Sequence, residues 1–348
     1  MTRSTKVRPY RLGIDTAEAC DLEAAAFTED YRRMGEDPRL EAKRESRVER
    51  VLSWAGRFVP SLRYARMGYV MEQDGRITSI ALFSRDGVKG SRWSIDALGT
   101  HPDSQKRGMA RQLLGHVFET IHDQGGEVCT LKVRQDNAAA YRLYQSLGFA
   151  HFHTSRQLKR QIRVPVRSEG PLDGLEAIKL PEWYSIWRER MQLAMRFTPS
   201  HVQEFKPVLE TGFRRSRFIR ALGPWVIKLS GVKLDQWILR VSNQLVATLR
   251  TRADMTGNRS HEIRLSIDPE WSSEFAGPLL RIALERLSQY PATATLVEVG
   301  GNEAPILEAL KVAGFEEMST WHWLGVQIPQ ASGIGSQAAI IELDNVTV

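Results

Sequence analysis

The segment from Leu98 to Leu114, LGTHPDSQKRGMARQLL, holds residues that could bind a phosphate group. Its pattern predicts a β-strand, a short loop with one glycine, and a helix that starts at once. Such a loop leaves backbone N–H groups unpaired, and the positive end of the helix dipole adds to their attraction for an anion. Gly108 permits close approach of the backbone to a phosphate, and Ala110 leaves the helix start uncrowded. The segment therefore predicts a pyrophosphate cradle, although it is neither a Walker loop nor a GxGxxG fingerprint.

Basic residues support this interpretation. Lys106, Arg107 and Arg111 lie in or beside the loop, and residues 1–170 hold 29 Lys+Arg against 21 Asp+Glu, a net charge of +8. The rest of the chain has 19 against 20, a net charge of −1. A basic first half suits a phosphorylated cofactor or nucleic acid, and charge alone does not choose between these partners or a solvated surface.

The sequence gives little support for a metal site, a disulfide framework or a cysteine nucleophile. The two cysteines, Cys20 and Cys129, lack metal-ligand and disulfide-framework spacing, and the eight histidines contain no HxxxH pair, so we expect no metal. Cys129 lies in the apolar run Val128–Val133 and is predicted to be a buried hydrophobe rather than a nucleophile. No apolar run is long enough for a membrane span, and the first residues resemble no signal peptide, so we expect a cytoplasmic protein.

Alternating strands and helices surround the loop. Strands are expected over 77–84 and 93–100, followed by a helix over 111–122 with one apolar face and a strand over 128–133. A second helix over 138–147 is closed by Gly148. Ahead of these lie a helix over 16–27, capped by Asp15 or Thr16, and a longer charged helix over 38–59.

The same order of parts recurs in the second half of the chain. His101-Pro102 matches Asp268-Pro269 at an offset of 167, and Gly148-Phe149 matches Gly314-Phe315 at an offset of 166. A single register that links features about fifty residues apart indicates an internal repeat. A length of 348 residues suits two domains of ordinary size.

Two blocks of the first half resemble the GNAT superfamily of N-acetyltransferases. Gln105-Lys106-Arg107-Gly108-Met109-Ala110 is similar to the family's phosphate signature Q/R-x-x-G-x-G/A, and the usual His-Pro precedes it. The pattern Asn137, Ala140, Leu143-Tyr144, Gly148-Phe149 resembles the second conserved block. The resemblance covers about residues 70 to 162.

This resemblance implies a role for each matching residue. A bulged strand pairs its backbone with the pantetheine arm of acetyl-coenzyme A, here through Leu98, Gly99 and Thr100. The loop from Gln105 to Ala110 holds the pyrophosphate, through Gln105, Lys106, Arg107, Gly108, Met109 and Ala110. Asn137 contacts the pantetheine arm, and Tyr144 approaches the thioester sulfur.

An amine that attacks the thioester directly needs no enzyme nucleophile, only orientation, an oxyanion donor and proton transfer. The expected donor is the N–H of Leu98, and the expected general acid is Tyr144, with Tyr141 as the alternative. Asp96 is the candidate base, placed two residues before Leu98 on the same strand face. An ion pair with an arginine explains Asp96 equally well.

The second half lacks this chemistry. Its loop after Pro269 contains Glu270 and Glu274 and no basic residue, so its charge opposes phosphate binding. Ala309 or Leu310 stands where Tyr144 stood, and Asn302 takes the place of Asn137. Trp321 and Trp323, two apart on a strand, fit a domain interface or a substrate pocket.

We therefore predict an α/β (α+β) fold with two tandem GNAT-like domains, each a mixed, mostly antiparallel sheet flanked by helices. The expected bounds are a catalytic domain over 1–165, a linker over 166–180, a degenerate domain over 181–330, and a tail over 331–348 that could add a final strand. The expected activity is acetyl transfer from acetyl-coenzyme A, the cosubstrate, to a small-molecule or peptide amine in a ternary complex. The alternatives are an acyl-coenzyme A sensing module without turnover and, with less support, a nucleic-acid binder. Neither the acceptor nor the oligomeric state follows from the sequence.

Overall fold

A computed structural model describes residues 5–34, 37, 67–86, 90–161, 172–214, 220, 227, 230–301 and 303–329. The chain forms two compact units. The first unit draws on Met1–Thr28, Pro38–Phe152 and His322–Val348, and the second on Glu29–Asp37 and His153–Trp321. Among the described residues, no helix combines the length and apolarity needed to cross a membrane.

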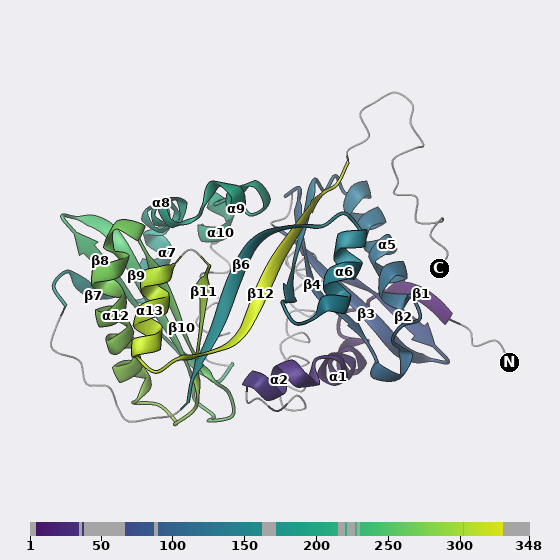
Figure 1. The fold of residues 1–348 in the computed structure, drawn as a ribbon, viewed down its shortest axis with the longest axis horizontal. Helices are drawn as coiled ribbons and strands as arrows, with labels where there is room; N and C mark the ends of the chain where they lie inside the picture. Colours follow the sequence, from purple (N-terminus) through teal and green to yellow (C-terminus); the bar gives the residue numbers. More distant parts are fainter. Residues whose placement is uncertain are drawn as a thin grey trace. The chain divides into compact units, whose positions relative to one another are not determined.

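The first unit is built on a mixed, mostly antiparallel sheet (Figure 1). Four strands pair antiparallel in chain order, and β4 then pairs in parallel with β5. The end of β12 (Glu316–Gln327) follows β5 in the strand order. The bounds of the other strands are β1 Thr5–Pro9, β2 Met67–Gln73, β3 Arg76–Arg85, β4 Arg92–Thr100 and β5 Val128–Arg134. The expected strands over 77–84, 93–100 and 128–133 are thus confirmed.

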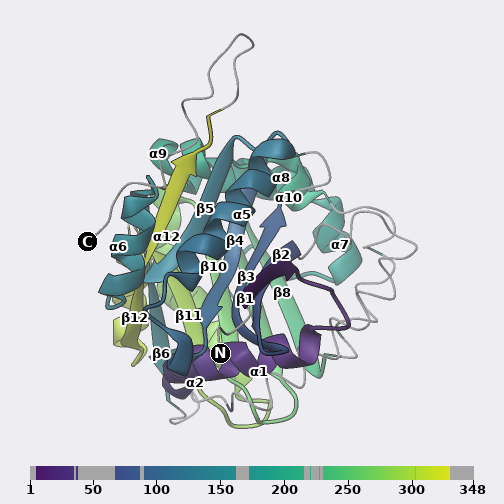
Figure 2. The same ribbon diagram turned by 90° about the vertical axis from the view of Figure 1, so that its right-hand side faces the viewer.

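Helices cover both faces of this sheet. Helix α5 (Met109–Asp123) lies along the strands in Figure 2, and α6 (Ala138–Ser146) shares its apolar core. On the opposite face, α1 (Thr16–Ala26) packs on β3 and β4. The alternation of β3 explains both contacts, because Ala81 and Phe83 belong to the core under α5 whereas Ile80 and Leu82 belong to the core under α1.

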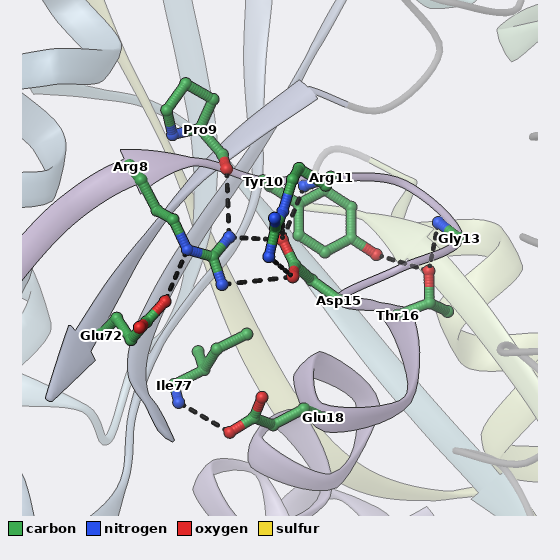
Figure 3. A network of polar contacts seen from close by, with 10 residues as sticks. All are labelled: Arg8, Pro9, Tyr10, Arg11, Gly13, Asp15, Thr16, Glu18, Glu72 and Ile77. Carbon is green, nitrogen blue, oxygen red and sulfur yellow. Dashed lines mark hydrogen bonds and ion pairs between the residues drawn. The ribbon is translucent and has the colours of Figure 1, made fainter. Parts of the chain in front are cut away.

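A buried carboxylate joins β1 to the start of α1 (Figure 3). Asp15 is 4% exposed, and its oxygens accept hydrogen bonds from Arg8 at 2.6 Å and from Arg11 at 3.1 Å. Arg8 also donates to Glu72 on β2 at 2.7 Å. Burial alone would raise the pKa of Asp15, but the hydrogen bonds from the two arginines lower it below its ordinary value. Asp15 is the cap residue of α1, as predicted. Its side chain accepts hydrogen bonds from the arginines and caps no N–H group of the helix.

The second unit repeats this architecture. Its sheet holds β7 (Leu175–Ala177), β8 (Val232–Val241), β9 (Gln244–Asp254), β10 (His261–Ile267) and β11 (Thr295–Gly300). Helices α12 and α13 pack on one face, and α7 and α8 pack on the other. The helix bounds are α7 Leu180–Ser185, α8 Trp187–Phe197, α9 Ser200–Phe205, α10 Glu210–Phe213, α12 Ser272–Leu287 and α13 Ala304–Val312.

The repeat extends to the turn that follows the fourth strand of each unit. Pro102–Ser104 and Pro269–Trp271 each form one 3₁₀ turn. In each case the preceding residue caps the turn with its side chain, His101 for Asp103 N–H and Asp268 for Glu270 N–H. Two tandem copies of one fold, each a mostly antiparallel sheet flanked by helices, are therefore confirmed.

The last strands of the two halves depart from the expected borders of 1–165 and 181–330. Residues 153–160 of β6 (Ala150–Arg160) pair with β11 in the second unit, whereas residues 322–327 of β12 belong to the first. Residues 29–34 of α2 (Thr28–Met34) also belong to the second unit, where Lys159 donates to the backbone of Arg33 and Met34.

Other expected segments lie partly or wholly outside the described residues. The predicted linker over 166–180 contains the strand β7, which pairs with β8, and its first residues up to 171 are not described. The expected helix over 38–59, the residue Asn302 and the tail over 331–348 also lie outside the described residues.

Candidate active site

A bulge interrupts β4 at Asp96. Ile95 pairs with Phe83 on β3, and Ala97 pairs with the adjacent Leu82. Asp96 is thus an extra residue of β4 between two consecutive pairs. On the other side, the parallel pairing of β4 with β5 ends at Ile95 and Leu131. The two strands therefore part at the bulge, and a gap opens beside the last residues of β4.

The backbone of Leu98 faces this gap. His101 donates its N–H to the carbonyl of Thr78 on β3 at 2.9 Å. Because successive residues of a strand direct their backbone groups to opposite sides, Gly99 also faces β3, whereas Leu98 and Thr100 face away from it. The carbonyl of Gly99 accepts a hydrogen bond from Ser79 Oγ at 2.9 Å, in agreement with this pattern. The gap is thus lined by backbone groups that the ladder with β3 does not use.

The loop between β4 and α5 has the form of an anion cradle. Gly108, the cap of α5, adopts a φ of 76°, a left-handed conformation that favours glycine. A β-carbon built on Gly108 would meet nothing within 4 Å, and no side chain caps the first turn of α5. The loop therefore leaves open space beside Gly108, at the start of a helix whose first turn has no side-chain cap.

Polar side chains of the loop hold its shape. Gln105 donates to the carbonyl of Thr100 at 3.3 Å, and Arg107 donates to the carbonyl of Asp103 at 3.0 Å. Arg111 bonds Ser146 Oγ at 2.7 Å and so links α5 to α6. Lys106 and Arg107 are exposed, whereas Met109 is buried and anchors the start of the helix.

Tyr144 reaches the core between α6 and β5. It is 6% exposed, and its ring meets Phe149 edge-on at 5.7 Å between centroids. Burial, with a smaller effect of Cys129, raises the pKa of Tyr144 to about 12. Within the described part of the chain, its hydroxyl makes no hydrogen bond. Tyr141, the alternative, is only partly buried, and its ring lies 5.5 Å from that of His322.

Asn137 has a structural role in the same region. Its Oδ1 accepts the N–H of Ala140 at 3.1 Å and caps α6. The side chain is exposed, and its amide nitrogen is not used by this cap. A contact between Asn137 and the pantetheine arm stays a prediction.

Asp96 and Leu98 do not share a strand face, contrary to expectation. The bulge breaks the alternation, so Leu98 packs with the core under α5 whereas Asp96 is exposed. The charge of Asp96 adds to burial in raising the pKa of Cys129, so that thiol stays protonated and is no nucleophile. Among the described residues, no group of His, Cys, Asp and Glu is arranged to hold a metal ion.

The second unit has different residues at the positions that correspond to the bulge, the loop and Tyr144. Strand β10 pairs with β9 without a bulge. Trp271 and Phe275 stack 5.6 Å apart at the start of α12, which carries Glu274 in its first turn. Leu310, fully buried in α13, corresponds to Tyr144 by the glycine offset, and Glu303 rather than Asn302 is the cap that corresponds to Asn137.

One contact near the gap did not emerge from the sequence. Lys132 on β5 places its ammonium 4.5 Å from the ring centroid of Trp323. The alternation of β5 predicts that Lys132 points away from the core under α5, but no local pattern pairs it with a residue so distant in the chain.

Comparisons with known proteins agree with this architecture. The model of the acetyltransferase (GNAT) family matches residues 19–149. The ribosomal protein bS18 alanine N-acetyltransferase of Escherichia coli (strain K12) is 31% identical over 83 residues, which cover 24% of this chain and 54% of that protein. The L-amino acid N-acyltransferase MnaT of the same organism is 33% identical over 82 residues, 23% of this chain and 48% of that protein. The chain thus spans about half the length of the curated relatives it matches.

Two solved structures share the fold over nearly the whole chain. A tandem GNAT protein from the clavulanic acid biosynthesis pathway superposes with a TM-score of 0.64 at 14% identity, covering 94% of this chain and 100% of that chain. A GCN5-related N-acetyltransferase from Sphaerobacter thermophilus superposes with a TM-score of 0.63 at 15% identity, covering 94% and 96%.

Proposed function

We propose that the first unit transfers an acetyl group from acetyl-coenzyme A to a primary amine, because residues 19–149 match the model of the acetyltransferase (GNAT) family. The amine attacks the thioester directly in a ternary complex, without a covalent enzyme intermediate. The acceptor is a small-molecule or peptide amine. Relatives named for a protein alanine and for L-amino acids support an amine acceptor of this kind.

The observation that carries this proposal is the alignment of the cradle with the gap. The open space before Gly108 lies at the end of the loop that leaves β4, and the bulged strand itself borders the gap. A diphosphate at the start of α5 fits the uncapped N–H groups, and an extended pantetheine arm fits the backbone groups of Leu98 and Thr100. The residues present therefore suit the cosubstrate at both ends.

Three groups of the first unit would then serve the reaction. The N–H of Leu98 donates to the carbonyl oxygen as negative charge develops there. Asp96, at the mouth of the gap, accepts a proton from the ammonium group of the acceptor, directly or through water, and the neutral amine then attacks the thioester. Tyr144 donates to the departing sulfur.

The raised pKa of Tyr144 defines that last role more closely. With a pKa of about 12, the phenol stays protonated throughout the neutral range. A thiolate with a pKa of about 8.5 is a weaker base than this phenolate, so Tyr144 stabilises the thiolate by a hydrogen bond more than by complete proton transfer.

The second unit has no equivalent set of groups. An unbulged β10, an acidic loop filled by Trp271 and Phe275, and Leu310 in place of the phenol all oppose the same chemistry. We therefore assign turnover to the first unit alone.

Calorimetric titration with coenzyme A, combined with an assay of thiol release over a panel of amines, tests this function. We expect Gly108→Glu to abolish coenzyme binding, because a carboxylate would enter the anion cradle. Gly115→Glu is the matched control, since Gly115 lies on the same helix with open space around its β-carbon. Unchanged affinity in Gly108→Glu would remove the basis of the proposal. Tight binding without any amine product, and with no effect of Tyr144→Phe, would instead indicate a sensing module.

A further inference from the structure

A buried serine of β3 lies beside the strand that borders the gap. Ser79 is 0% exposed, and it pairs with Met71 on β2 and with Thr100 on β4. Two residues further along β3, on the same face, Ala81 belongs to the core under α5. A hydroxyl at so apolar a position destabilises the fold unless the protein itself supplies its hydrogen-bond partners. The partners of Ser79 therefore show what this hydroxyl does.

Both partners of the Ser79 hydroxyl lie at the end of β4. Its Oγ donates to the carbonyl of Gly99 at 2.9 Å and lies 2.8 Å from Oγ1 of Thr100. A carbonyl oxygen can only accept a hydrogen bond, and a serine hydroxyl has a single proton. The proton of Ser79 therefore goes to Gly99, and Thr100 must donate its own proton to Ser79.

The bond to Gly99 acts on a group that faces the gap. The carbonyl of Gly99 and the N–H of Thr100 belong to one planar peptide, and in a trans peptide these two groups point in opposite directions. Because Ser79 holds the carbonyl toward β3, it also holds the N–H of Thr100 toward the gap. A hydrogen bond accepted by the carbonyl polarises the peptide and strengthens its N–H as a donor.

The next peptide of the chain already has partners within the protein. The carbonyl of Thr100 accepts a hydrogen bond from Gln105 Nε2 at 3.3 Å. The N–H of His101 donates to the carbonyl of Thr78 at 2.9 Å. Of the two backbone groups of Thr100, the N–H is therefore the better placed to meet a ligand.

We propose that Ser79 is a positioning residue for the cosubstrate. It fixes the peptide between Gly99 and Thr100 so that the N–H of Thr100 donates to an amide carbonyl of the pantetheine arm. The inference rests on the proposed function, because the arm belongs to the proposed cosubstrate. The bonds of Ser79 go to the end of β4 and not to the loop at Gly108 or to Tyr144, so removal of its hydroxyl should weaken binding of the arm alone.

Ser79→Ala is the test variant, and Thr130→Val is the matched control. Alanine fits the space of serine, and Ala81 already occupies the next position on that face. Thr130, which is 3% exposed, is a second buried hydroxyl of the same sheet, but it donates to the carbonyl of Trp93 at 3.4 Å, before the bulge of β4.

Calorimetry compares the binding of coenzyme A with that of 3′-phospho-ADP, the part of coenzyme A that lacks the pantetheine arm. We expect Ser79→Ala to lower the affinity for coenzyme A about three- to tenfold, as the loss of one neutral hydrogen bond implies. The KM for acetyl-coenzyme A should rise by the same factor with kcat unchanged, because binding to the arm is equal in ground and transition states. The affinity for 3′-phospho-ADP should not change, and Thr130→Val should behave as wild type with both ligands.

The backbone amide of Thr100 gives a second readout, in NMR spectra of the whole chain. In the wild type, coenzyme A should shift the amide nitrogen resonance of Thr100 and slow exchange of its N–H with solvent, and Ser79→Ala should reduce this protection. Unchanged exchange in the wild type with coenzyme A bound would overturn the role of Ser79. So would equal losses of affinity for the two ligands in Ser79→Ala, or no loss for either.

The same measurements separate this inference from the proposed function. A loss in Ser79→Ala that is specific to the arm, in a protein that acetylates no amine, would overturn the proposed acetyl transfer and retain the role of Ser79. Acetylation of an amine with no effect of Ser79→Ala on the KM for acetyl-coenzyme A would overturn the role of Ser79 alone. Failure of the wild type to bind coenzyme A would overturn both.

Discussion

Leu98 on β4 and Ala81 on β3 lie opposite each other in the strand register without exchanging a backbone hydrogen bond. Their position in the alternating ladder directs the N–H of Leu98 into the gap beside β5. The N–H proposed as oxyanion donor can therefore be removed without breaking a hydrogen bond between β3 and β4, which is rarely possible for a backbone group in a strand.

Leu98→Pro should lower kcat by about a hundredfold or more, the usual effect of losing one oxyanion donor, while coenzyme A still binds. Proline is tolerated where the missing N–H serves no ladder bond. The matched control is Ala97→Pro, which removes an N–H directed to β3 and should destabilise the protein. Kinetics of thiol release and calorimetry with coenzyme A measure both effects, and wild-type kcat in a folded Leu98→Pro variant would exclude the assigned donor.

Tyr144→Phe should lower kcat by about a hundredfold and leave coenzyme affinity unchanged, because only the donor to the departing sulfur is lost. Burial raises the pKa of Tyr144 to about 12, so the phenol keeps its proton at every pH well below 12. The pH profile of the wild type should accordingly show no alkaline loss of rate near pH 10, where an ordinary tyrosine titrates. Tyr141→Phe is the control and should keep wild-type kcat; a larger loss there would exchange the two assignments.

Gly99→Val should destabilise the first unit by about 1–3 kcal/mol, the typical cost of overpacking. A β-carbon at Gly99 would lie 3.3 Å from Ala26 Cβ and 3.4 Å from Leu22 Cδ2, so α1 would have to move off β4. Urea denaturation measures the change. Gly115→Val, on the open side of α5, is the control, and an equal loss there would mean that contact with α1 is not the cause.

Local patterns were sufficient to predict the loop between β4 and α5, the helices around it and the repeat. The position of the loop and the apolar face of α5 depend on neighbouring residues, and both occur where expected. The bulge left a weaker signal, because buried residues of β4 occur at Trp93 and Ile95 and the next core contact comes at Leu98, three residues on. This change from a two-residue to a three-residue spacing explains why the prediction that Asp96 and Leu98 share a strand face was wrong.

Partner choice among distant strands could not be predicted in the same way. Periodicity indicates that residues 153–160 and 322–327 are strands, but it carries no information on which edge each will join. The pairing of β6 with β11, and the contact of Trp323 with Lys132, depend on that choice. The sequence therefore predicted the local elements around the candidate site better than the pairing of its distant strands.

Asp15→Asn should lower the free energy of unfolding by about 2 kcal/mol at neutral pH, since it breaks a buried ion pair whose arginines keep some access to water. The hydrogen bonds from Arg8 and Arg11 hold the folded pKa of Asp15 below its ordinary value despite burial. A lowered folded pKa stabilises the protein above the unfolded pKa of about 3.9, and this contribution is lost as the pH falls through the folded pKa. Urea denaturation of wild type and variant at pH 7 and pH 3 should therefore show a difference that shrinks in acid. Asp21→Asn, on the exposed side of the same helix, should cost little at either pH, and a constant difference for Asp15→Asn would show that its charge is not what stabilises the junction of β1 and α1.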